Sequence, residues 1–336
     1  MKYLGVGLVV GLLMVLMVGM AQVAFAQGQS KTTIMLYTSM PTDIVSSLET
    51  AFEAKYPNID LQFVRSGTGK IKTRIATEAE AGQIEADLIW VADFSYYEDL
   101  KEKGYLLKYE SPEAKVIPGA LKDPEGYYYG ARIISEVIAY NTNLVTTPPQ
   151  SWKDLLDSQW KDQIIIADAT YSGAALVAMG ALTTEYGLSY YRGLRANGTA
   201  VVSGHGGLTR SIASGEYMVG MTLDYMVRQQ KAAGSPIDIV YPSDGAIAIP
   251  SPIAIVATTK HPEAAEKFVD YVLSAEGQKA LVEMGSFIPV RPDVASPAGA
   301  PSLSQLVKNE MPVDYNYIRR NAEFLTQKFT EIMLAP

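Results

Sequence analysis

Short loops rich in glycine, serine and threonine are the parts of this sequence best suited to binding chemistry. Four such loops follow short apolar segments, at 38–43, 66–70, 168–174 and 203–207. Hydroxyl groups donate hydrogen bonds, and glycines let backbone N–H groups approach a ligand closely. Groups of this kind bind oxyanions, above all at the N-terminus of a helix. We therefore select as candidate ligand-binding residues Ser39, Ser66, Gly67, Thr68, Lys70, Ser172 and Gly173.

Three acidic residues and one tyrosine follow other apolar segments and could contact the opposite, polar or cationic end of a ligand. Asp93, Asp244 and the pair Asp224 and Tyr225 occupy such positions. Each aspartate also has a plain structural alternative, because Asp is common in helix caps and Asp-Gly, as at 244–245, is an ordinary turn dipeptide. The residue types alone leave this choice open.

Catalysis has few candidate residues. The chain has no cysteine and two histidines, of which His261 precedes a proline at a helix start and is expected to be structural. His205 is then the one histidine suited to act as a general base. No Gly-x-Ser-x-Gly or His-Glu-x-x-His motif occurs, and the loop at 66–70 lacks the spacing of a nucleotide-binding P-loop. We therefore predict no enzymatic activity, no cofactor and no metal, with an exported hydrolase using His205 as an alternative.

The candidate loops must be positioned by alternating strands and helices. From residue 32 onward, short apolar segments alternate with amphipathic ones, as in parallel sheets covered by helices. The predicted strands are 33–37, 60–64, 87–91, 163–167, 200–203, 218–222 and 237–241. The predicted helices are 43–56, 70–81, 151–156, 172–185, 208–214, 262–273 and a last one near 319–333. Because ligands of such α/β folds bind at the carboxyl ends of the strands, we expect the loops to share one cleft.

Two longer apolar segments, 127–141 and 246–258, interrupt the alternation and are predicted to be the crossover strands of a hinge. The chain is also long enough for two domains of common size. We expect lobe 1 to contain 27–131 and 250–300, and lobe 2 to contain 132–249 and 301–336. One continuous large sheet is the alternative.

The first 26 residues predict export. Lys2 precedes an uncharged apolar run, and Ala24-Phe25-Ala26 is typical of a signal-peptide cleavage site. An uncleaved membrane anchor is the alternative, because the run could span a bilayer. Without cysteine, neither a lipid-modified cysteine nor a disulfide can form, so we expect a freely diffusing periplasmic protein. The net charge of −8 and the lack of a basic block argue against nucleic acid or an anionic membrane as partners.

Several short motifs, in the same order along the chain, resemble the family 1 extracellular solute-binding proteins of ABC importers. They are Leu36-Tyr37-Thr38-Ser39, Arg65-Ser66-Gly67-Thr68-Gly69-Lys70, Ala86-Asp87-Leu88-Ile89-Trp90, Ile166-Ala167-Asp168, Ala213-Ser214-Gly215-Glu216, Lys260-His261-Pro262-Glu263, Ser274-Ala275-Glu276-Gly277-Gln278 and Ile288-Pro289-Val290-Arg291-Pro292. The resemblance implies an α/β, two-lobe type II periplasmic-binding fold. In that fold each lobe is a mixed sheet flanked by helices, and a two-strand hinge joins the lobes around the ligand. It also implies a monomer with an ABC permease of the inner membrane as partner.

Two branches of this family bind different ligands. The branch for phosphonates or hexose phosphates resembles this chain at Ser39, Ser66, Thr68, Ser172 and Gly173. In that branch, acids at the positions of Asp224 and Asp244 would meet an ammonium, as in 2-aminoethylphosphonate, or sugar hydroxyls. The ferric-iron branch usually has adjacent tyrosines, but here only Tyr225 matches and no histidine lies near Ser39. We therefore expect a small oxyanion-bearing ligand, with ferric iron bound through Tyr225 as the alternative.

Overall fold

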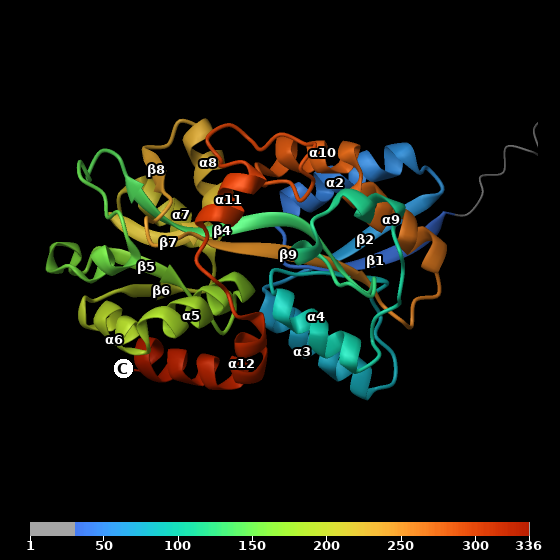
Figure 1. The fold of residues 1–336 in the computed structure, drawn as a ribbon, viewed down its shortest axis with the longest axis horizontal. Helices are drawn as coiled ribbons and strands as arrows, with labels where there is room; N and C mark the ends of the chain where they lie inside the picture. The colour runs from blue at the N-terminus through green and yellow to red at the C-terminus, as the bar shows by residue number, and fades with distance from the viewer. Residues whose placement is uncertain (1–30, 336) are drawn as a thin grey trace, which may run out of the picture.

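The computed structural model describes residues 31–335, so the predicted signal peptide at 1–26 lies outside the described residues. Helices and strands alternate along the chain, and the strands form a central layer between helices (Figure 1). This arrangement confirms the predicted α/β class. None of the helices formed by residues 31–335 has both the length and the apolarity needed to cross a lipid bilayer.

All seven predicted strands are present. They are β1 (Thr32–Thr38), β2 (Ile59–Arg65), β3 (Leu88–Trp90), β5 (Ile164–Ala167), β6 (Ala200–Val202), β7 (Val219–Leu223) and β8 (Ile237–Val240). The two predicted crossover segments form the long strands β4 (Tyr129–Asn141) and β9 (Ile247–Ile255), which pair with each other in antiparallel orientation. Nearly every residue of these two strands is buried, as expected of apolar strands that are covered on both faces.

The strands join into one hydrogen-bonded path with the order β2-β1-β3-β9-β4-β7-β5-β6, and β8 pairs with β4. The pairs β1–β2, β1–β3, β5–β6 and β5–β7 are parallel. We call β1, β2 and β3 the first strand group and β5, β6 and β7 the second strand group. In hydrogen bonding the sheet is continuous, while β9 and β4 stand between the two groups, where a hinge was predicted (Figure 1). The residue limits of the two lobes stay a prediction.

Most predicted helices are present, and several more appear between them. The predicted ones are α2 (Thr42–Lys55), α3 (Thr68–Glu80), α5 (Gly173–Tyr186), α7 (His205–Ser214), α9 (Pro262–Leu273) and α12 (Tyr315–Phe329). The additional ones are α4 (Phe94–Glu102), α6 (Ser189–Ala196), α8 (Asp224–Ala232), α10 (Ala275–Gly285) and α11 (Leu303–Asn309). The segment predicted at 151–156 forms a short 3-10 helix, Trp152–Leu156. Helix α7 begins three residues earlier than predicted, so His205 is its first residue.

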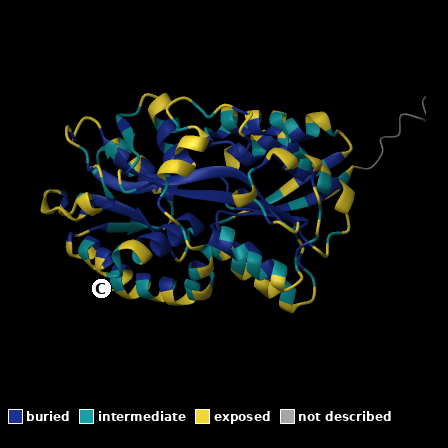
Figure 2. Ribbon diagram, in the orientation of Figure 1, coloured by how far each residue is buried: buried dark blue, intermediate teal, exposed yellow. Residues whose placement is uncertain are grey.

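The core follows the sheet and one enclosed helix. Figure 2 shows the central strands buried, with exposed residues on the outer helices. Helix α5 is buried from Gly173 through Leu182, because it is apolar around its whole circumference. The C-terminal helix α12 packs against α5 and also against α4, so it contacts helices that follow strands of both groups. The fold therefore brings both groups of strand-end loops into one assembly.

Candidate ligand-binding site

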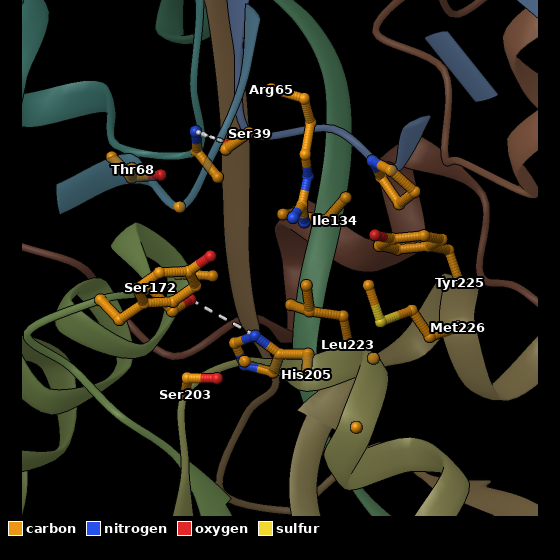
Figure 3. A pocket seen from close by; sticks show the side chains of 18 of the residues that line it. Ser39, Arg65, Thr68, Ile134, Ser172, Ser203, His205, Leu223, Tyr225 and Met226 are labelled. Atoms are coloured by element: carbon orange, nitrogen blue, oxygen red, sulfur yellow. Dashed lines mark hydrogen bonds between the residues drawn. The ribbon is translucent and has the colours of Figure 1, made fainter. Parts of the chain in front are cut away.

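A cavity of about 540 Å³ lies where the loops after β1, β2, β5, β6 and β7 meet. Figure 3 shows Ser39, Arg65 and Thr68 on one side of it and Ser172, Ser203 and His205 on the other. The volume lies within the range usual for small-molecule sites. Because Thr38 at the end of β1 stands opposite Arg65 and Trp90, and Ala167 of β5 stands opposite Val202, the strand ends of each group share one edge. The parallel pairing therefore places the polar loops together, as predicted.

Five helices begin at this cavity. The residues that precede their first turns all line it, and they are Pro41 for α2, Gly67 for α3, Ser172 for α5, Gly204 for α7 and Leu223 for α8. The first N–H groups of a helix have no partner inside the helix, and the helix dipole places partial positive charge there. Such helix ends favour negatively charged ligands. Their convergence makes the cavity suited to a negatively charged ligand.

Three arginines strengthen this preference, and the sequence analysis missed all of them. Arg65, Arg132 and Arg210 line the cavity, and Asp43 is the carboxylate residue among the lining residues. Three positive charges and one negative charge give +2 before any contribution from His205, whereas the whole chain carries −8. The site is therefore a local positive region in an acidic protein.

Arg132 is the most unusual of the three arginines because it is buried while two of its guanidinium nitrogens lack hydrogen-bond partners among residues 31–335. It lies on β4, its exposed fraction is 2%, and its Nε and Nη1 atoms have no hydrogen-bond partner among the described residues. Its guanidinium lies 4.2 Å from the ring centre of Phe287. Burial lowers the pKa of Arg132 to about 10, although Tyr225 acts against this shift, so the group is charged at neutral pH. A buried charge whose N–H groups are only partly satisfied is costly, and an anionic ligand would relieve that cost.

Five of the eleven predicted site residues line the cavity. They are Ser39, Gly67, Thr68, Ser172 and Tyr225. The Ser39 hydroxyl accepts a hydrogen bond from the Ala92 N–H group at 3.3 Å, so its own hydrogen can be donated to a ligand. Ser66 does not line the cavity, although its neighbours Arg65 and Gly67 do. Its N–H group donates to the Thr38 carbonyl at 3.1 Å. Lys70 is exposed, with its Nζ 5.8 Å from the ring centre of Tyr171.

Two predicted acids lie away from the cavity wall. Asp93 is fully buried, caps α4 and forms an ion pair with Lys72. Asp244 accepts hydrogen bonds from the Trp152 N–H group and, at 2.7 Å, from the Tyr186 hydroxyl. It lines a different pocket, formed by the turn at 241–246 and residues of α11. Both carboxylates bind groups of the protein, as expected if these aspartates are structural residues of helix caps and turns.

Asp224 lies behind the cavity wall rather than on it. One carboxylate oxygen accepts hydrogen bonds from the N–H groups of Ser135 at 3.0 Å and Tyr225 at 2.8 Å. The other accepts from Arg228 at 2.8 Å and from the Tyr241 hydroxyl at 3.1 Å. The side chain is completely buried, so its acceptor positions are used within the protein. Asp224 thereby fixes the position of Tyr225, which does line the cavity.

The substitution Asp224→Ala is therefore expected to destabilise the fold. Arg228 is buried, and loss of its partner leaves an uncompensated charge, which costs about 3–5 kcal/mol. Urea unfolding of the variant should show this loss. The matched control is Asp238→Ala, which removes an exposed ion pair with Lys231 and should cost less than about 1 kcal/mol. A variant of native stability that no longer binds ligand would instead favour direct contact between Asp224 and the ligand.

Glycines allow the two loop sets to touch at the edge of the cavity. The Gly69 N–H group donates to the Tyr171 carbonyl at 3.2 Å, and a Cβ atom on Gly69 would lie 2.5 Å from the Thr170 carbonyl oxygen. A Cβ on Gly67 would lie 2.5 Å from the Tyr171 ring, and one on Gly173 would lie 2.6 Å from the Ala92 carbonyl oxygen. Gly173 thus acts in close packing of backbones, without lining the cavity itself.

A family model described as "Bacterial extracellular solute-binding protein" matches residues 85–321. A protein of Salmonella typhimurium, described as a "putative 2-aminoethylphosphonate-binding periplasmic protein", is 28% identical over 252 residues, which are 71% of this chain and 72% of that protein. A Haemophilus influenzae protein of undescribed function is 24% identical over 275 residues, 78% of each chain.

Solved structures are similar over nearly the whole chain. The periplasmic binding protein AfuA from Actinobacillus pleuropneumoniae, with fructose-6-phosphate bound, has a TM-score of 0.82 and 25% identity, covering 91% of this chain and 100% of that one. Iron-bound HitA from Pseudomonas aeruginosa has a TM-score of 0.78 and 21% identity, covering 88% of this chain and 98% of that one. These likenesses confirm the predicted type II periplasmic-binding fold.

Proposed function

The chain belongs to the family of bacterial extracellular solute-binding proteins, and from this premise we propose that its cavity captures a small oxyanion-bearing ligand, a phosphonate or a sugar phosphate. The family and the named relatives are binding proteins, in agreement with the predicted receptor of an ABC importer and against an exported hydrolase. The relatives are named as periplasmic, which supports the periplasm as the location of this protein. A permease of the inner membrane is the corresponding partner.

The buried and incompletely hydrogen-bonded guanidinium of Arg132 is the feature that carries this proposal. It faces the same cavity as the five helix N-termini and the hydroxyls of Ser39, Thr68 and Ser172. A phosphoryl or phosphonyl group has several oxygens and up to two negative charges, so it can pair with a guanidinium and accept from hydroxyls and N–H groups together. We place this group between the N-termini of α3 and α5.

The rest of the ligand would lie toward α2 and α8, where the cavity is lined by Asp43, Tyr225 and Met226. A carboxylate and a phenol suit an ammonium group or sugar hydroxyls. The Salmonella relative is named for an aminophosphonate, and AfuA was solved with a sugar phosphate. Both ligands combine one phosphorus oxyanion with a polar remainder, which is the shared chemistry that we propose for this site.

Closure of two lobes would complete the site. We place β1, β2 and β3 in lobe 1 and β5, β6 and β7 in lobe 2, with β4 and β9 as the hinge. The contact between Gly69 and Tyr171 would then form on closure. Burial of the ligand's polar atoms gives selectivity, because each atom left without a partner costs about 1–3 kcal/mol.

Ferric iron, the alternative ligand, fits the cavity less well. The phenol of Tyr225 lines the cavity, but burial raises its pKa to about 12, which disfavours the phenolate that would bind iron. The three arginines also repel a trivalent cation. An iron-binding protein would require an accompanying anion to neutralise them.

A thermal-shift panel separates these ligands. We expect 2-aminoethylphosphonate or fructose-6-phosphate to raise the melting temperature, because a ligand that binds only the folded state stabilises it by about 2.7 kcal/mol at one hundred times its Kd. Ferric citrate is expected to give neither a shift nor a phenolate-to-iron absorption band. A coloured iron complex, or no response to any phosphorus oxyanion, would contradict the proposed ligand class.

A further inference from the structure

His205 is held between a carboxylate and a hydroxyl at the wall of the cavity. Its Nε2 atom lies 3.0 Å and 3.2 Å from the two carboxylate oxygens of Glu136 on β4. Its Nδ1 atom lies 3.3 Å from the Ser172 Oγ atom, a contact drawn in Figure 3. Glu136 and His205 are both buried, and Glu136 itself does not line the cavity. The imidazole therefore connects a hidden acid to a hydroxyl that faces the ligand.

The carboxylate determines where a neutral imidazole carries its proton. Glu136 accepts hydrogen bonds, so the proton of neutral His205 lies on Nε2, and Nδ1 has only a lone pair. Ser172 must then donate its hydroxyl hydrogen to Nδ1, while its oxygen accepts from the Ala175 N–H group at 3.3 Å. In this state the hydrogen of Ser172 is used inside the protein and cannot be donated to an anion.

A protonated imidazole reverses the direction of the hydrogen bond to Ser172. Nδ1–H then donates to the Ser172 oxygen, and the serine hydrogen must find another acceptor. An oxygen of a bound anion in the cavity is such an acceptor. We propose that capture of the anion is coupled to uptake of one proton from water by His205, and that Glu136 is the positioning residue for this coupling. This inference rests on the proposed anion-binding function.

The charges around His205 determine whether anion binding favours or opposes its protonation. Arg65, Arg132 and Arg210 around the cavity oppose an imidazolium while the cavity is empty, whereas Glu136 favours it. Asp43 is the carboxylate that faces the cavity, and it also favours an imidazolium. Tyr191 lies near Glu136. Its burial, and to a lesser extent the negative charge of Glu136, raises the pKa of Tyr191 well above the ordinary value, so Tyr191 stays neutral. A bound anion offsets the arginines, so anion and proton each favour the binding of the other.

Affinity should therefore rise as the pH falls from 8 to 5, the range in which imidazoles change charge. Coupling to one proton limits the change to about tenfold in Kd for each pH unit. A purely structural Glu136–His205 pair would stabilise the fold without any such linkage.

The test measures proton uptake by titration calorimetry with 2-aminoethylphosphonate in Tris, HEPES and imidazole buffers, which differ in ionisation enthalpy. The native chain should take up more protons than His205→Gln or Glu136→Gln at the same pH. Because the probe's own protonation contributes to all three proteins, the difference belongs to His205. Equal proton uptake by the native chain and by both variants would overturn the inference.

Nuclear magnetic resonance supplies a second readout that does not depend on those variants folding. The chain has two histidines, so His261→Gln leaves His205 as its one imidazole. We expect the ring resonances of His205 to shift to the protonated position when 2-aminoethylphosphonate is added near pH 7. Binding without this shift would overturn the inference and leave the proposed function intact. No binding of 2-aminoethylphosphonate, fructose-6-phosphate or inorganic phosphate would overturn both.

Discussion

Arg132→Met should weaken binding of a phosphorus oxyanion by about 30-fold to several thousandfold, because loss of one partner of a buried charge pair costs about 2–5 kcal/mol. The same substitution should leave the free energy of unfolding unchanged or raise it. Two nitrogens of the buried Arg132 guanidinium have no hydrogen-bond partner among the described residues, and Met fills a similar volume without charge. A loss of affinity without a loss of stability is the mark of a residue held for ligand binding.

Titration calorimetry and urea unfolding of the same preparations provide both quantities. The matched control is Arg74→Met, which removes an exposed arginine paired with Glu78 on the same helix and should change unfolding by less than about 1 kcal/mol, with no effect on affinity. A large loss of stability in Arg132→Met with unaltered affinity would mean that Arg132 serves the fold alone.

Gly69→Ala should weaken ligand binding by about 10- to 100-fold, a loss of about 1.4–2.7 kcal/mol. Gly69 lies in the first turn of α3, and an added methyl group would collide with the Thr170 carbonyl on the opposite side of the cavity. Closure would therefore be incomplete. Alanine is favoured over glycine in a helix by about 1 kcal/mol, so α3 itself should not be destabilised.

The control for this substitution is Gly119→Ala, because an added Cβ at Gly119 has no atom within 4 Å. Both variants should unfold like the native chain, and only Gly69→Ala should bind weakly. Small-angle X-ray scattering with saturating ligand should show a larger radius of gyration for Gly69→Ala than for the native chain. Native affinity in Gly69→Ala would show that the close approach of Gly69 to Thr170 is not part of the closing movement.

Much of the fold could be predicted because its signals are local. Each strand is a short apolar segment, and β4 and β9 stand out as long buried runs. Polar loops after parallel strands must share a sheet edge, which is why Ser39, Thr68 and Ser172 were found together. Short helices such as α8, which has nine residues, were not recognised, although α8 supplies Tyr225 to the cavity.

The charged part of the site could not be predicted in the same way. Arg132 and Glu136 lie inside an apolar strand, and no local pattern tells whether such a charge faces a ligand, an ion-pair partner or another element. Asp224 did carry a signal that was overlooked. It stands four residues before Arg228, the spacing of an ion pair on one helix face, and the structure contains that pair. Three-dimensional placement, rather than residue type, separates the ligand-facing charges from the internal ones.

A crystal structure of the protein with 2-aminoethylphosphonate would show where the anion lies. We expect the phosphorus between the N-termini of α3 and α5, with its oxygens on the hydroxyls of Ser39, Thr68 and Ser172 and on the guanidinium of Arg132. Electron density for the phosphonate in the pocket beside Asp244, or at the protein surface with this cavity empty, would contradict capture by the converging helix ends.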